Sequence, residues 1–161
     1  MPIIASDIKF RQSGAGNLGG AMSGSDVSSA LHGLFDVVAG YESLAGDVEY
    51  RCVYVLNNHA TLTLYNAAAF IQTNSPSSDT SVDIGVGTSA VNGTEQTIAD
   101  ENTAPAGVSF SAPGAYVGGL SIGDIPAGQH QAIWIRRTIS AGAAAYSNDG
   151  MTLAVQGDTA V

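Results

Sequence analysis

The stretch that decides the fold is DVEYRCVYVLNNHATLTLYNAAAFI, residues 47–71. In its first half, Tyr50 and Cys52 belong to an alternation of period two among β-branched and aromatic residues. This pattern is typical of a strand with one buried face. The alternation resumes at residues 61–65, after asparagines that tolerate the left-handed backbone angles of a tight turn. The stretch therefore predicts two antiparallel strands that pair with each other as a hairpin.

Short segments with strand patterns recur along the rest of the chain, separated by Gly, Pro, Asn and Asp. They are residues 81–88, 96–98, 108–110, 120–125, 129–139 and 151–155. The turn signal Asp149-Gly150 also predicts a hairpin before the last of them. Many short strands without a long helical pattern favour two packed sheets. We predict an all-β fold, an antiparallel β-sandwich or jelly roll of about seven to eight strands.

The N-terminal segment has a different composition. Residues 13–33 are rich in Gly and Ser and carry few apolar side chains, so they bury too little surface to become ordered alone. Before them, Ile4, Ile8 and Phe10 form a weak alternation that suits an edge strand or an anchor. We expect an extended Gly-rich arm here, and we expect deletion of residues 1–25 to leave the sandwich folded.

The length of the chain fits one globular domain with this arm. At 161 residues it has the size of an ordinary domain and buries enough surface for a core without disulfides. We divide it into an N-terminal arm, residues 1–33, and a β-sandwich domain, residues 34–161.

The composition is unusually poor in charge. Charged residues make up 12% of the chain, against about 25% in average soluble domains. Such a surface suits a protein that packs against copies of itself or other partners. The formal net charge is −9, which supplies no basic footprint for nucleic acid and repels anionic lipids. No apolar run of membrane-spanning length and no signal-peptide layout is present, so we expect a soluble protein that binds neither nucleic acid nor membrane.

Residues suited to metal or thiol chemistry are sparse. Cys52 is the single cysteine, which excludes an intramolecular disulfide, and its place in a strand predicts a packed core thiol. His32, His59 and His130 are not at metal-ligand spacing from one another. We read His59 as a turn residue. We predict no metal and no cofactor.

Catalytic patterns are equally sparse. No G-x-S-x-G elbow and no phosphate-binding loop occurs, so we predict no catalytic residue and no enzyme. The pair Asp47/Glu49 shares a strand face with Arg51, and we read the three as a solvated charge ladder. The pair Asp100-Glu101 reads as a solvated loop, with calcium binding together with Asp79 or Asp83 as an alternative.

The one basic cluster is Arg136-Arg137. Adjacent strand residues point to opposite faces of a sheet, so the two side chains have different surroundings. Two interpretations stay open. The pair keeps the strand soluble, or it clamps an acidic neighbour in an assembly of negatively charged copies.

Three blocks of sequence carry a resemblance. They are residues 46–64 (GDVEYRCVYVLNNHATLTL), residues 124–129 (DIPAGQ) with 133–137 (IWIRR), and residues 5–10 (ASDIKF) with the Gly-rich run that follows. These blocks resemble segments of small structural proteins of tailed bacteriophages. The resemblance implies a non-enzymatic capsid decoration (cement) protein, made in the host cytoplasm and located on the capsid surface. Its implied partners are the major capsid protein and copies of itself, as a homo-oligomer about a symmetry axis.

Candidate partner-binding residues follow from the arm and the basic pair. They are Ile3, Ile4, Ile8, Phe10, Arg136 and Arg137. Two alternatives stay open: a phage tail or baseplate component, and a carbohydrate-binding module. The second requires an aromatic platform drawn from Tyr41, Tyr65, Tyr116, Tyr146 and Trp134.

Overall fold

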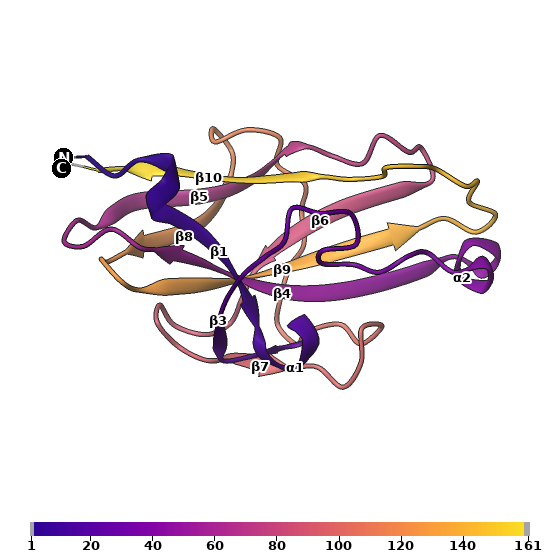
Figure 1. Ribbon diagram of the computed structural model, residues 1–161, viewed down its shortest axis with the longest axis horizontal. Helices are drawn as coiled ribbons and strands as arrows, with labels where there is room; N and C mark the ends of the chain where they lie inside the picture. The colour runs from indigo at the N-terminus through magenta and orange to yellow at the C-terminus, as the bar shows by residue number, and fades with distance from the viewer. Residues whose placement is uncertain (1, 160–161) are drawn as a thin grey trace.

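The computed structural model describes residues 2–159 and shows an antiparallel sandwich (Figure 1). The larger sheet has the order β3-β1-β4-β9-β6, with β1 (Ile8–Ser13), β3 (Met22–Asp26), β4 (Asp47–Asn57), β6 (Thr80–Val86) and β9 (His130–Ile139). The smaller sheet has the order β10-β5-β8, with β5 (Leu64–Thr73), β8 (Leu120–Ile125) and β10 (Thr152–Asp158). The remaining elements are the pair β2 (Gly19–Gly20) and β7 (Glu95–Thr97), the helices α1 (Gly14–Asn17) and α2 (Gly40–Ala45), and the 3₁₀ turn η1 (Ala5–Asp7). The predicted all-β antiparallel sandwich is confirmed, while the strand order does not establish a jelly roll.

The main core lies between the two sheets. Val53 and Val55 of β4 and Ile133 of β9 face the smaller sheet. That sheet presents Ala67 and Ala69, which are fully buried, and such small side chains let the two layers approach closely. Each large apolar side chain buried in this way stabilises the fold by roughly 1.5–3 kcal/mol.

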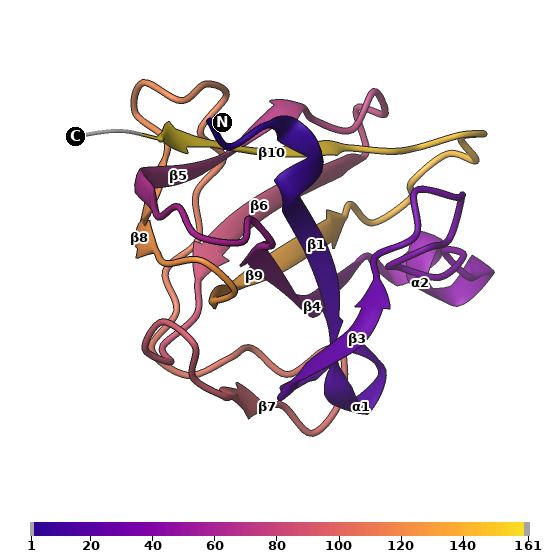
Figure 2. The same ribbon diagram turned by 60° about the vertical axis from the view of Figure 1, so that its left-hand side comes forward.

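A further layer covers the other face of the larger sheet (Figure 2). Residues 87–112 cross this face and place Val108 and Phe110 against Tyr50 and Trp134. The crossing is close: a Cβ at Gly85 would lie 2.5 Å from the Val108 side chain, which requires glycine there. The segment 108–110, predicted as a strand, lies in this layer outside any strand. Strand β4 is therefore buried on both faces, not on one as predicted.

The predicted hairpin between the two halves of residues 47–71 is wrong. β4 pairs with β1 and β9, whereas β5 pairs with β10 and β8, so the chain passes from one sheet to the other after Asn57. The side chain of Asn57 is fully buried at this crossing, and its Nδ2 donates to the carbonyl oxygens of Leu62 and Ile125, both at 2.8 Å. The hairpin predicted at Asp149-Gly150 is also wrong, because β9 and β10 lie in different sheets.

The N-terminal segment is part of the larger sheet. β1 runs antiparallel to β4, from Ile8 opposite Asn57 to Gln12 opposite Val53, and β3 pairs with the outer side of β1. We predicted an arm over residues 1–33, but residues 8–26 are strands and turns of the sandwich. The Gly-rich composition of this stretch permits the turn at Gly14–Asn17 that joins them.

Candidate functional site

Three segments that are distant in the sequence meet at one end of the sandwich, away from η1 (Figure 1). They are residues 27–39, α2 and residues 140–150, and we call this region the α2 end. The backbone N–H groups of Gly142 and Ala143 donate to the carbonyl oxygen of Ser43, at 2.8 and 3.0 Å. Ser140 in turn donates to the carbonyl oxygen of Asp79 at 2.8 Å. These bonds tie the loops to each other and to the larger sheet.

Exposed apolar side chains concentrate at the α2 end. Five of the seven large exposed apolar side chains among the described residues lie here: Leu31, Val37, Tyr41, Leu44 and Tyr146. Tyr41 and Leu44 of α2 are 74% and 78% exposed. Single exposed apolar residues are ordinary, but a group of them marks a surface suited to a partner.

A cavity of about 900 Å³ lies under these loops. Its walls include Phe10, Val53 and Ile135 of the larger sheet, Leu153 of β10, and Leu34 of residues 27–39. A volume of this size is in the range of small-molecule sites, and its lining is chiefly apolar. The α2 end is therefore loosely filled beneath its loops.

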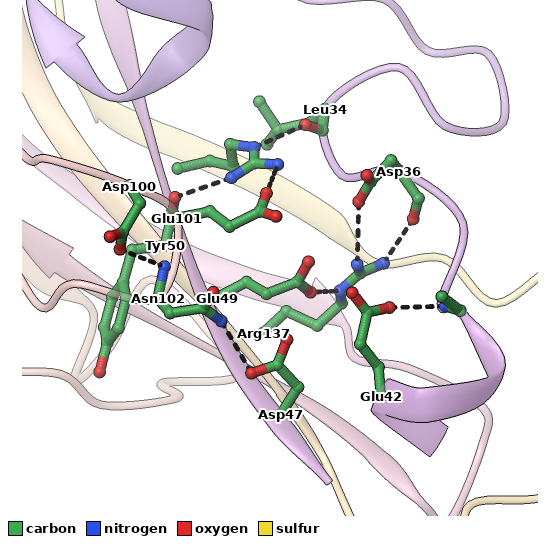
Figure 3. Close-up of polar contacts among 12 residues, drawn as sticks. Leu34, Asp36, Glu42, Asp47, Glu49, Tyr50, Asp100, Glu101, Asn102 and Arg137 are labelled. Carbon is green, nitrogen blue, oxygen red and sulfur yellow. Dashed lines mark hydrogen bonds and ion pairs between the residues drawn. The ribbon is translucent and has the colours of Figure 1, made fainter. Parts of the chain in front are cut away.

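A buried polar cluster lies beside this cavity (Figure 3). Glu49 of β4 is fully buried, and its Oε2 accepts a hydrogen bond from Nε of Arg137 on β9. Arg137 also donates from Nη1 to the carbonyl oxygen of Asp36 at 3.0 Å and lies 4.7 Å from the Phe35 ring centroid. Burial raises the pKa of Glu49, and the adjacent guanidinium opposes this rise only in part. The predicted solvated ladder is thus wrong for Glu49.

Arg51 belongs to the same cluster and is also buried. It is 8% exposed, forms an ion pair with the carboxylate of Glu101, and donates from Nε to the carbonyl oxygen of Leu34 at 3.2 Å. Segment 27–39 and the loop after β7 therefore close over these polar side chains, which the sequence alone had placed in solvent.

The basic pair on β9 is held within the chain. Arg136 and Arg137 point to opposite faces, as predicted: Arg136 lies 5.0 Å from the Phe110 ring centroid and donates to Asp83 at 2.7 Å. Arg137 contacts Glu49 on the other face. Binding of either arginine to an acidic neighbour would therefore compete with an existing ion pair.

The predicted contact residues of the N-terminal segment are mostly inside the fold. Ile3, Ile8 and Phe10 are partly buried and pack against the main core. Ile4 is 58% exposed and is the one of the four whose side chain is largely available to a partner. Partner binding by these residues stays a prediction.

The aromatic platform of the carbohydrate-binding alternative is incomplete. Trp134 is fully buried on β9 under residues 87–112, so it is not available to a glycan. Tyr41 and Tyr146 lie at the α2 end, whereas Tyr116 donates from its hydroxyl to the carbonyl oxygen of Asn66. The five aromatic residues therefore do not share one surface.

The remaining candidates have ordinary structural roles. Cys52 is fully buried, as predicted, and burial raises the pKa of its thiol to about 12. His59 is a turn residue: its Nδ1 accepts from the backbone N–H of Thr61 and of Leu62, at 3.2 and 3.0 Å. The alternative calcium set is not assembled: in residues 2–159 no group of three neighbouring carboxylates joins Glu101 to Asp79 or Asp83. Asp83 is instead paired with Arg136.

A second buried carboxylate, Glu95, lies on the opposite face of the larger sheet. It is 3% exposed and accepts from the Ser89 N–H at 2.8 Å and the Thr88 hydroxyl at 3.0 Å. Burial alone would raise its pKa, but the hydrogen bonds from Ser89 and Thr88 lower it to about 2. The ionised carboxylate therefore holds the first turn of residues 87–112.

Glu95→Gln is expected to remove an acid-sensitive part of the stability. Because the folded-state pKa of about 2 lies below the ordinary value of 4.5, this stability is complete above pH 4.5 and lost as the pH falls toward 2. At pH 7 the free energy of unfolding of the variant should be about 3 kcal/mol lower than that of the wild type, and this gap should shrink at pH 3. Urea unfolding at both pH values measures this, and a difference independent of pH would contradict it.

The comparisons with known proteins give no assignment. No family model, curated protein or solved structure matches the chain. The bacteriophage resemblance therefore rests on the sequence blocks alone. In residues 2–159, no helix has the length and apolar character needed to cross a membrane.

Proposed function

We propose that the protein is a non-enzymatic structural protein of a tailed-bacteriophage virion that binds the capsid exterior as a decoration protein. The observation that carries this proposal is the group of exposed apolar side chains at the α2 end, on a chain with 12% charged residues. Such a group suits burial against another protein. The resemblance of residues 46–64 and 133–137 to phage virion proteins supports this kind of assembly.

The distribution of charge favours apolar attachment. All four arginines have an acidic partner within the chain: Arg11 with Asp26, Arg51 with Glu101, Arg136 with Asp83, and Arg137 with Glu49. Copies with a net charge of −9 repel one another, so contact with the major capsid protein or a second copy must gain its free energy from buried apolar surface. Each copy needs only modest affinity, because a closed lattice engages many copies at once.

Tyr41→Ser combined with Leu44→Ser is expected to weaken binding to shells of the major capsid protein at least about tenfold. Burial of two such side chains contributes more than the roughly 1.4 kcal/mol that a tenfold change requires. Both side chains are more than two-thirds exposed in the free protein, so its melting temperature should be unchanged. Co-sedimentation with shells, at low and high salt, measures the affinity.

Val117→Ser is the matched control. Val117 is 91% exposed and precedes β8, outside the α2 end, so its loss should leave shell binding unchanged. Normal binding by the Tyr41/Leu44 variant would contradict the proposal. Density for the protein in a tail ring of purified virions would favour the tail or baseplate alternative, and glycan binding that is lost with Tyr41 would favour the carbohydrate-binding alternative.

A further inference from the structure

The carboxylates around Glu49 outnumber the cations that face them. Two groups of three carboxylates share Glu49, and in each group the oxygen atoms lie within 4.8 Å of one another. The members are Asp36, Glu49 and Glu101 in one group and Glu42, Asp47 and Glu49 in the other. Two guanidinium groups, those of Arg51 and Arg137, offset these five carboxylates. Two of the five, Glu42 and Glu49, are buried, and uncompensated negative charge is costly where water is excluded.

Glu49 itself has an oxygen without a partner. Its side chain is fully buried, and its Oε1 accepts no hydrogen bond from the described residues, while Oε2 is used by Arg137. Buried carboxylate oxygens are normally hydrogen-bonded or bound to a cation. This oxygen is an observation separate from the count of charges, and it indicates a ligand or a proton at this place.

The two groups differ in what their other carboxylates already do. Glu101 and Asp36 are each engaged by an arginine, Arg51 and Arg137 respectively. Glu42 is 8% exposed and accepts from the N–H of Ala39. Asp47 accepts at Oδ1 from the N–H of Val48 at 2.8 Å and from Nδ2 of Asn102 at 2.7 Å. Within residues 2–159, neither Glu42 nor Asp47 forms an ion pair. The second group is therefore the more negative of the two.

We infer that Glu42, Asp47 and Glu49 form a binding site for a divalent cation of the calcium class (Figure 3). Calcium takes six to eight oxygen ligands in irregular geometry and completes its shell with water. This suits three carboxylates of which one, Asp47, is only partly buried. Neither group contains a histidine or cysteine, so the donor set favours calcium over zinc. The inference does not depend on the proposed virion function.

Cation binding at this site would join α2 to the start of β4. Glu42 lies in α2, whereas Asp47 and Glu49 lie in β4, on either side of Gly46. A ligand that binds the folded chain alone stabilises it by mass action. Calcium would therefore raise the melting temperature and hold in place the helix that carries Tyr41 and Leu44.

The test uses the full chain after removal of metal by a chelator. Titration calorimetry with calcium should show one ion per chain, terbium luminescence should report the same site, and calcium should raise the melting temperature reversibly. Asp47→Asn and Glu42→Gln should each weaken binding at least tenfold. Asp26→Asn is the matched control, because Asp26 lies on β3 and pairs with Arg11.

Absence of calcium and terbium binding to the wild-type chain at millimolar concentration would overturn the inference. Loss of binding in Asp36→Asn with normal binding in Asp47→Asn would also overturn it, because the ion would then belong to the other group. Glu49→Gln should abolish binding in a folded chain. If that variant does not fold, Asp47→Asn decides, because Asp47 is only partly buried.

Discussion

A chain that lacks residues 2–13 is expected to be unfolded, without a cooperative thermal transition. The deletion removes β1, which pairs with β4 from Ile8 to Gln12 and packs Ile8 and Phe10 against the main core. Loss of a strand ladder and of two large apolar side chains, at roughly 1.5–3 kcal/mol each, is comparable with the total stability of about 5–15 kcal/mol of a small domain. Circular dichroism during heating and binding of a hydrophobic dye measure the outcome.

Two point variants separate the strand from the residues before it. Phe10→Ala should lower the free energy of unfolding by about 2–3 kcal/mol, because the Phe10 side chain is partly buried in the core. Ile4→Ala, at a side chain 58% exposed, should change stability by less than about 0.5 kcal/mol. A truncated chain that melts like the full-length protein would contradict this result and restore the interpretation of residues 1–33 as a removable arm.

The sequence predicted strands better than it predicted their partners. Strands β4 and β9 were found because they alternate strongly, and β5, β6, β8 and β10 followed from weaker patterns. The partners of β4 and β5 were predicted wrongly because the sequence of a chain reversal after Asn57 is the same whether the next strand joins the same sheet or the opposite one. β3 was missed because Met22–Asp26 is polar and edge-exposed, so it carries no alternation.

The polar cluster was placed in solvent for a related reason. Glu49 and Arg51 share a face of β4 with Val53 and Val55, so the strand pattern becomes polar toward one end of that face. Such a change normally marks the limit of a core. Here residues 27–39, which form neither a helix nor a strand in the structure, fold over that end and bury the charges. Burial that depends on an irregular segment leaves no periodic signal in the sequence.

Arg137→Ala is expected to lower the free energy of unfolding by about 3–5 kcal/mol at neutral pH. Glu49 is fully buried, and the guanidinium of Arg137 is its ion-pair partner among the described residues. The substitution leaves a buried carboxylate without compensation and also removes the contact with the Phe35 ring. Urea unfolding of the variant measures the loss.

Arg136→Ala is the matched control on the neighbouring position. Arg136 is 33% exposed at its side chain and pairs with Asp83, which is 22% exposed, so solvent screens the pair and the loss should be about 1 kcal/mol. The double variant Arg137→Met with Glu49→Leu should recover most of the stability, because both charges are removed together.

The loss of unfolding free energy caused by Arg137→Ala should also depend on pH. Burial already raises the pKa of Glu49, and without the guanidinium nothing opposes that rise. A raised folded-state pKa means that the folded chain takes up the proton first as the pH falls, so the buried charge disappears under mild acid. The loss should therefore be largest near pH 8 and smaller near pH 5. Two outcomes would show that Glu49 is not the group that Arg137 stabilises. One is an equal loss of unfolding free energy in Arg137→Ala and Arg136→Ala. The other is a loss in Arg137→Ala that does not change with pH.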